Sequence, residues 1–147
     1  MAIFHFRLEA SLHLAEQALE KVQREFAQEV QLWQTLTEAC ELQQEQFNHA
    51  QEGQRDAGRY RPVELGNWQL FAAGQQRRLH QCDAELRTQE FIMEDARHCL
   101  LEAHREVEKF HRLKEKQTKA FQLIELQKEQ KVSDETGQVL HWRQQVK

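Results

Sequence analysis

The chain carries two long tracts in which apolar residues recur with the alternating three- and four-residue spacing of a coiled coil. Between Leu8 and Ala50, eleven of the thirteen positions on this spacing are apolar, and between Leu65 and Phe110 twelve of fourteen are apolar. Spacing of this kind, kept over six heptads, places one narrow apolar stripe along a helix and indicates a coiled-coil seam. The pattern therefore predicts two long helices, each with one face suited to pairing.

The segment between the two tracts is rich in loop-forming residues, among them Gly53, Gly58 and Pro62. A short connection between two seams of equal length predicts an antiparallel hairpin, because parallel pairing needs a linker as long as the helices. The expected fold class is all-α, one long antiparallel two-helix coiled-coil hairpin whose C-terminal helix overhangs. The predicted boundaries within this single domain are helix 7–52, loop 53–65, helix 66–136 and tail 137–147.

Polar residues that interrupt the seams fix the predicted alignment of the two helices. Glu29 with Gln89, and Gln43 with Gln75, are placed symmetrically about a turn near residue 59. Each polar residue therefore has another at nearly the same height on the opposite helix, where the two can share hydrogen bonds. The same alignment sets the start of the first helix opposite Phe110. Residues 115–135 are then expected to project about 30 Å beyond it.

The composition supports extended helices around a thin core. Of 147 residues, 39% are hydrophobic, 30% are charged and one is proline. Residues 8–52 contain nine glutamates and two basic residues, whereas residues 109–131 contain seven basic residues and three glutamates. The absence of a long apolar run or a secretory signal, and an odd count of three cysteines, lead us to expect a cytoplasmic protein.

Motifs for catalysis or for metal and nucleotide binding were not found in the sequence. His80 with Cys82, and His98 with Cys99, lack the spacing of a zinc site. We expect no metal, no cofactor and no enzymatic activity. Cys40 is expected to face Cys82 across the seam as a small buried residue.

Apolar residues outside the seams cluster toward both ends of the predicted hairpin. Phe4 and Phe6 admit two interpretations, a protein-binding surface or a segment that folds over the overhang. Phe91 and Leu101 also face outward and are candidates for a third contact. The remaining clustered residues are Leu42, Tyr60, Val63, Leu70 and Phe71 near the loop, and Leu113, Phe121, Leu123, Ile124 and Leu126 near the open end.

The two ends of the sequence resemble those of the flagellar FliJ proteins. The resemblance covers the whole chain and extends to the related stalk proteins of injectisome type III secretion systems. The motifs that carry it are Phe4-His5-Phe6-Arg7-Leu8-Glu9 followed by Leu12, and Glu108-Lys109 through Glu129-Gln130-Lys131 to Asp134-Glu135.

This resemblance implies a non-enzymatic component of the flagellar export apparatus, comparable to the central stalk of rotary ATPases. It implies binding to the hexameric export ATPase, to a membrane protein of the export gate and to export chaperones, at the cytoplasmic face of the inner membrane through these partners. Helix one departs from the family near Gln43, which stands where an aromatic residue is common. The implied sites are Phe4, Phe6, Leu8, Phe110, Lys114, Phe121 and Ile124 for the ATPase, and Phe47, Trp68, Leu70 and Phe71 for the gate.

Three other classes of protein were weighed against this interpretation. A prefoldin-like holdase needs strand-forming segments between its helices, and the predicted loop shows no alternation of period two. A nucleic-acid-binding hairpin is disfavoured because the acidic first helix repels phosphate, so no nucleic acid partner is expected. Another kind of coiled-coil adaptor remains compatible with the pattern.

Overall fold

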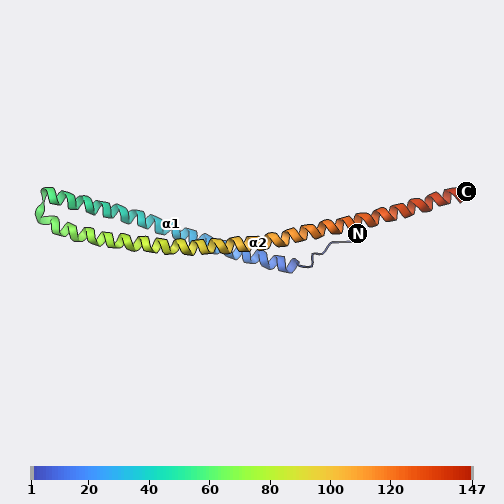
Figure 1. Cartoon of the computed structure of the whole chain (residues 1–147), viewed down its shortest axis with the longest axis horizontal. Helices are drawn as coiled ribbons and strands as arrows, with labels where there is room; N and C mark the ends of the chain where they lie inside the picture. Colours follow the sequence, from blue (N-terminus) through green and yellow to red (C-terminus); the bar gives the residue numbers. More distant parts are fainter. Residues whose placement is uncertain (1, 147) are drawn as a thin grey trace. The chain divides into compact units, whose positions relative to one another are not determined.

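The computed structural model describes residues 2–146, and nearly all of them are helical. Helix α1 spans Glu9–Tyr60 and helix α2 spans Leu65–Val146, with 52 and 82 residues (Figure 1). Arg61 and the 3-10 turn η1, Pro62–Glu64, connect them. The described residues contain no strand. The predicted all-α fold, in which two helices pack against each other, is confirmed.

The contacts divide the chain into two compact units, and both helices contribute to each. The hairpin unit comprises Glu20–Glu102 and contains the connection between α1 and α2. The terminal unit comprises Met1–Leu19 and Ala103–Lys147. Within each unit the two helices run antiparallel, because partners of rising number on α1 have falling numbers on α2.

The predicted seam is confirmed along both helices. Every seam position except Leu8 is buried or half-buried, and Leu8 is 36% exposed because it precedes the first helical residue. The core is nevertheless thin, since no large side chain among residues 2–146 is fully buried. Two paired helices bury only one stripe each, so most of every helix remains in contact with water.

The polar seam residues form the pairs that their positions predicted. Gln43 Nε2 donates hydrogen bonds to the side-chain and backbone carbonyls of Gln75. Gln89 Nε2 donates to the Glu29 carboxylate and, at 3.1 Å, to its backbone carbonyl. No buried side-chain nitrogen or oxygen in residues 2–146 lacks a hydrogen-bond partner. These bonds offset the cost of placing polar groups in the seam.

The predicted loop over 53–65 is wrong for its first eight residues, because α1 continues to Tyr60. Gly53 has no positive φ and continues the helix. The Trp68 ring occupies the space that a side chain at Gly53 would fill, and Ala57 is only 1% exposed. A glycine costs a helix about 1 kcal/mol, and this packing contributes stability against that cost.

The predicted helix end at 136 is also wrong, because α2 continues through the expected tail to Val146. Lys147 lies outside the described residues. Gly137 has no positive φ, and the Thr136 hydroxyl before it donates to the Val132 carbonyl at 2.8 Å, which satisfies that polar group within the helix. Helix propagation adds one hydrogen bond for each residue, so isolated weak residues are tolerated. Neither helix has a stretch in residues 2–146 that is long and apolar enough to cross a lipid bilayer.

The expected start of the first helix at residue 7 is corrected to Glu9. Residues 2–6 have no helical structure and pack against α2 within the terminal unit. Phe4 and Phe121 place their ring centroids 5.4 Å apart. Of the two interpretations offered for Phe4 and Phe6, the structure therefore contains the contact with α2. The overhang predicted to be bare is partly covered at Phe121.

Candidate functional site

A small apolar cluster organises the terminal unit. Phe6, Leu12 and Val107 form its buried centre, and the Glu9 backbone N–H donates to the Phe6 carbonyl at 3.1 Å. This bond turns the chain from the N-terminal segment into α1 and leaves the Phe6 ring against α2. The partly buried residues around the centre are Phe4, Ala15, Leu19, Phe110 and Leu113.

Charged contacts hold the start of α1 to α2 beside this cluster. Lys114 Nζ lies 2.9 Å from the Glu9 carboxylate and 6.0 Å from the centroid of the Phe6 ring. His111 Nε2 lies 3.3 Å from the Glu16 carboxylate. The Lys114 side chain remains 39% exposed, so part of it stays in contact with water. Lys114 is therefore both a structural contact and a surface charge.

The terminal unit also exposes apolar side chains. Phe4 and Phe121 line an open groove with Leu126, and Ile124 is 50% exposed. All seven residues predicted to bind the ATPase belong to this unit. The structure buries Phe6 and half-buries Phe110, and it leaves Leu8 and Ile124 at the surface. The other residues lining the groove are Ala2, Thr118, Gln122, Glu125 and Glu129.

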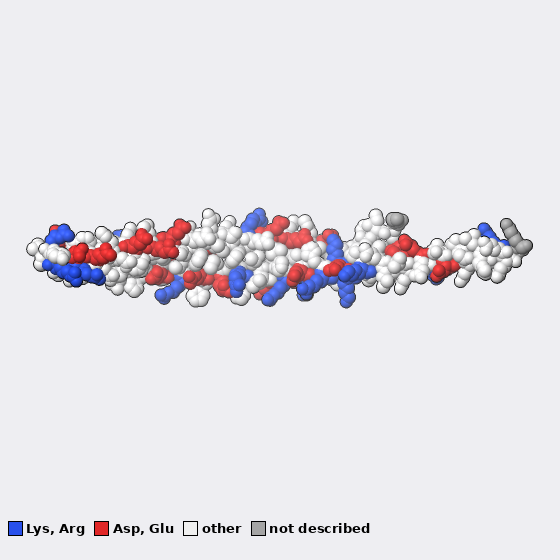
Figure 2. All heavy atoms as spheres, turned by 90° about the horizontal axis from the view of Figure 1, so that it is seen from above, with Lys and Arg blue, Asp and Glu red and all other residues white. Residues whose placement is uncertain are grey.

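A basic stripe runs along the outer face of α2 in the same unit. Its residues alternate at four- and three-residue spacing, which places them on one side of the helix. The basic segment was predicted from the sequence, whereas this stripe was not, although the residue spacing contains it. Figure 2 shows basic side chains gathered into groups on the charged surface. The stripe consists of Arg105, Lys109, Arg112, Lys116 and Lys119.

The hairpin unit presents an aromatic surface near the connection between the helices. Trp68 contacts Phe71 edge to face, with ring centroids 5.9 Å apart, and lies 6.2 Å from the His49 ring. Phe71 and His49 line an open groove with Leu42. Phe71 is 45% exposed, so this groove offers aromatic area to a partner.

The four residues predicted for the gate contact are placed differently within this surface. Trp68 and Phe71 lie together, Leu70 is exposed, and Phe47 is a half-buried seam residue. His49 was missed, because nothing in its sequence position distinguished it from other polar residues outside the seam. His49 lines the groove and also contacts the Trp68 ring.

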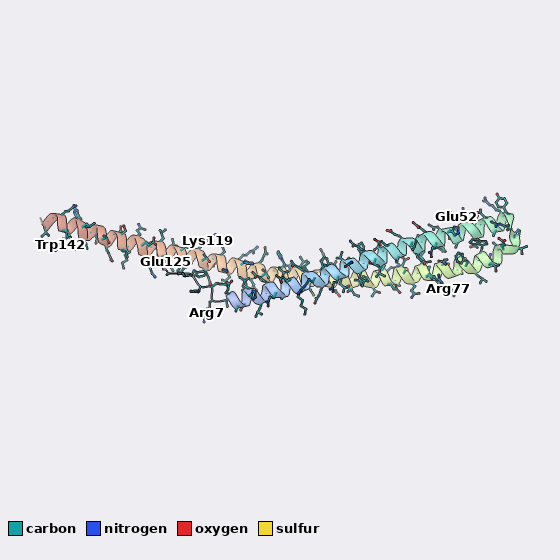
Figure 3. All side chains as sticks on the ribbon, turned by 180° about the vertical axis from the view of Figure 1, so that it is seen from behind. Arg7, Glu52, Arg77, Lys119, Glu125 and Trp142 are labelled. Atoms are coloured by element: carbon teal, nitrogen blue, oxygen red, sulfur yellow. The ribbon has the colours of Figure 1, made fainter. Side chains whose placement is uncertain are left out.

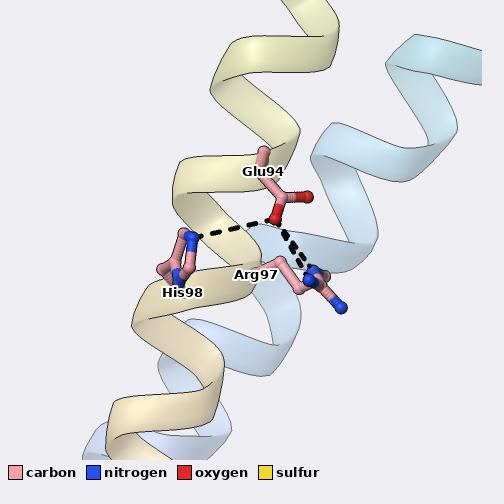
Figure 4. A network of polar contacts seen from close by, with 3 residues as sticks. All are labelled: Glu94, Arg97 and His98. Carbon is pink, nitrogen blue, oxygen red and sulfur yellow. Dashed lines mark hydrogen bonds and ion pairs between the residues drawn. The ribbon is translucent and has the colours of Figure 1, made fainter.

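A network of charged side chains outside these two surfaces lies on an exposed face of α2. Glu94 accepts from Arg97 Nη2 at 3.1 Å and lies 3.7 Å from His98 Nε2, all on one exposed side of α2 (Figure 4). No group of three or more potential metal ligands is assembled among residues 2–146.

Cys40 faces Cys82 as expected, and burial together with that thiol raises the pKa of Cys40 to about 11. This thiol is therefore protonated at neutral pH.

Comparison with known proteins identifies the family of the chain. No curated protein and no solved structure is similar to the chain at a significant level. The family model described as flagellar FliJ protein matches residues 4–146, a range that contains both the terminal cluster and the aromatic surface of the hairpin unit. The chain therefore belongs to the flagellar FliJ protein family, whose members are components of the flagellar export apparatus.

Proposed function

We propose that this chain is a non-enzymatic stalk protein of the flagellar export apparatus. The terminal unit docks into the hexameric export ATPase, and the aromatic surface of the hairpin unit contacts the export gate. Export chaperones are further partners, and the protein works at the cytoplasmic face of the inner membrane through these contacts. Family membership supports the place in flagellar export, and the two surfaces support the division of roles.

The observation that carries the ATPase contact is the proximity of exposed apolar and basic side chains in the terminal unit. Leu8 and Ile124 are exposed, and Lys114, which contacts Glu9 next to Leu8, keeps part of its side chain in water. Basic groups speed the approach to an acidic or carbonyl-lined surface, and apolar groups supply contact area once the partners meet. A helix with both features suits insertion into a protein pore.

The gate contact rests on the aromatic groove. Trp68 is held in place by Gly53 and His49, which limits the conformational entropy that it loses on binding. Rigid aromatic side chains in partly formed pockets dominate the binding energy of many interfaces. Phe71 and Leu70 are exposed beside Trp68 and can pack against a partner.

The ATPase contact is tested with the double variant Leu8→Asp, Ile124→Asp in a pull-down with the flagellar export ATPase. We expect at least about a tenfold loss of binding, because two charges enter an apolar contact. The matched control is Phe91→Asp, Leu101→Asp, which places the same charges on exposed positions outside both surfaces. Circular dichroism should give equal helicity for both double variants. Unchanged ATPase binding by Leu8→Asp, Ile124→Asp would overturn this assignment.

The gate contact is tested by measuring how variants of each surface bind to both partners. Leu70→Asp, Phe71→Asp should reduce binding to the cytoplasmic domain of the gate protein and leave ATPase binding intact. The terminal variants should show the reverse pattern. If both pairs of variants weaken both partners equally, the division of roles between the two surfaces is wrong.

A further inference from the structure

The last part of α2 carries an apolar stripe that starts on the register of the seam and departs from it at Val132, Val139 and Val146. Eight residues follow one another at three- or four-residue spacing, and six of them are apolar. At 100° per residue they fall within a sector about 80° wide, which is one face of the helix. The stripe consists of Phe121, Ile124, Lys128, Val132, Glu135, Val139, Trp142 and Val146.

This stripe is exposed beyond Phe121. Val132, Val139, Trp142 and Val146 are between 50% and 68% exposed. Within the terminal unit, Figure 3 shows Trp142 on a part of α2 that lies away from Arg7 and the N-terminal segment. An exposed row of bulky apolar residues, about 40 Å long at 1.5 Å per residue, favours burial against a partner.

The two charged members of the stripe specify which partner fits. Lys128 and Glu135 lie at equal distances on either side of a point between residues 131 and 132. If an identical helix runs antiparallel about that point, Lys128 of each copy faces Glu135 of the other. The same alignment sets Ile124 opposite Val139 and brings the two Val132 side chains together at the centre.

We propose that this face of α2 binds the same face of a second copy of the chain, forming an antiparallel coiled coil centred on Val132. Two Lys128–Glu135 pairs then flank the centre, and Phe121 faces Trp142 at each end. This self-association goes beyond the stalk function, since it needs neither the ATPase nor the gate.

Other alignments of the same stripe are less favourable. A parallel, in-register pair places Lys128 against Lys128 and Glu135 against Glu135, and like charges in a seam are destabilising. An antiparallel pair shifted by four residues places Lys128 against Val139 and Glu135 against Val132, which buries charges without partners. Only the alignment centred on Val132 pairs both charges with opposite charges.

Two flanking charges modify this interface. In the single chain Lys128 Nζ lies 3.6 Å from the Glu125 carboxylate, a contact that the intermolecular pair replaces or shares. Lys131 lies beside the centre, where the two copies bring their Lys131 ammonium groups close to each other. Long lysine stems allow these groups to spread into water, so the repulsion is partial. Removal of the Lys131 charge should therefore tighten the dimer.

The test is sedimentation equilibrium of the full chain without partners, over a concentration series that reaches the millimolar range. We expect a monomer–dimer equilibrium. Lys128→Glu alone and Glu135→Lys alone should each weaken dimerisation at least about tenfold, because each creates two like-charge contacts. Two combinations should restore it. These are the double variant Lys128→Glu, Glu135→Lys, and an equimolar mixture of the two single variants, which pairs opposite charges in a heterodimer.

The outcomes separate the possible occupants of the stripe. A monomer at all concentrations would overturn the proposal and leave the stripe to a different protein. A dimer that is insensitive to the single charge reversals, or one that the mixture does not restore, would overturn the antiparallel alignment. The control Arg97→Glu lies on the hairpin unit and should not change the equilibrium. ATPase binding is not part of the readout, so the result does not depend on the stalk function.

Discussion

The paired amides in the seam set the alignment of the two helices at the cost of some stability. Gln43 Nε2 donates to the Gln75 side chain, so removal of Gln43 takes this bond from the buried Gln75 amide, whereas removal of the Gln75 side chain leaves Gln43 only the backbone carbonyl of residue 75. Such pairs fix register because a slipped alignment separates them. Such a pair favours one alignment of the helices only when both of its amides are present.

We predict that Gln43→Leu destabilises the chain by about 1–2 kcal/mol, because the buried Gln75 amide loses its side-chain partner. The double variant Gln43→Leu, Gln75→Leu should recover this loss and match or exceed the original stability, since two leucines complete an apolar layer. Urea unfolding followed by circular dichroism measures both. A stabilised single variant would contradict the role given to the pair.

Gly53 has an ordinary helical backbone, so the backbone conformation does not require a glycine there. The close approach of the Trp68 ring does require one. A Cβ atom at this position would lie 2.6 Å from Trp68 Cη2, whereas a Cβ at Gly74 would meet no atom within 4 Å. We predict that Gly53→Ala displaces the Trp68 ring and destabilises the chain by about 1–3 kcal/mol. Gly74→Ala is the matched control and should stabilise the chain by about 0.5–1 kcal/mol, because alanine is the better helix former. Tryptophan fluorescence and thermal unfolding report the two effects.

Cys40 gives the stability of the chain a dependence on alkaline pH. Burial raises the pKa of its thiol from the ordinary 9.0 to about 11, so the folded chain holds this proton more tightly than the unfolded chain. The resulting stabilisation is complete below pH 9 and is lost as the pH rises toward 11.

We predict that Cys40→Ala shows a smaller loss of stability between pH 8 and pH 11 than the unmodified chain does, measured as the shift in urea midpoint. The comparison removes contributions from lysines and other groups that both proteins share. Iodoacetamide at pH 8 should modify the exposed Cys99 well before the buried Cys40. Equal rates for the two thiols would contradict the burial of Cys40.

At the scale of helices, the heptad pattern predicted the structural features that depend on periodic burial of side chains. The seam positions, the antiparallel pairing and the partners of Gln43 and Glu29 all follow from spacing along the chain. The ends of the helices were predicted less well. Gly53 and Gly137 weaken a helix locally, but packing against Trp68 and the continuity of the hydrogen-bond ladder decide the outcome. Neither effect can be calculated from the residue and its neighbours in sequence.

For the candidate sites too, spacing along the chain predicted some features and left others unpredicted. The spacing placed Phe6, Phe110 and Lys114 at one end, but it could not show that Phe6 folds against α2 and that Glu9 holds Lys114. These contacts join a non-helical segment to a helix, and no periodicity describes such a segment. His49 was missed for a related reason, because an aromatic contact with Trp68 depends on the connection between the helices.

The N-terminal segment is an element whose stability rests on two rings. We predict that Phe6→Ala costs about 2–4 kcal/mol in the terminal unit, because the residue is buried against Leu12 and Val107. Amide hydrogen exchange should become faster in α1 before Leu19 and in α2 after Ala103, with little change in the hairpin unit. Phe91→Ala is the control, since its side chain is 75% exposed. Uniformly faster exchange in both units would argue against their separate stabilisation.

At the scale of the whole molecule, charge is distributed unevenly along the sequence. The basic stripe of α2 contrasts with nine glutamates in residues 8–52. We predict that Lys109→Glu, Lys116→Glu slows association with the export ATPase about tenfold at low salt, and that the difference shrinks as salt screens the charges. Arg77→Glu, Arg78→Glu in the hairpin unit is the matched control. Stopped-flow association rates measure the effect, and rates that do not respond to salt would exclude electrostatic steering.

The thin core has a further consequence for how the chain loses its structure. With no large side chain fully enclosed, each layer of the seam is supported mainly by the layers directly above and below it. Stability then accumulates along the helices as in a one-dimensional array. We expect each unit to melt by unzipping from its open end, so that a protease or chaperone can engage frayed turns while the remaining layers stay closed.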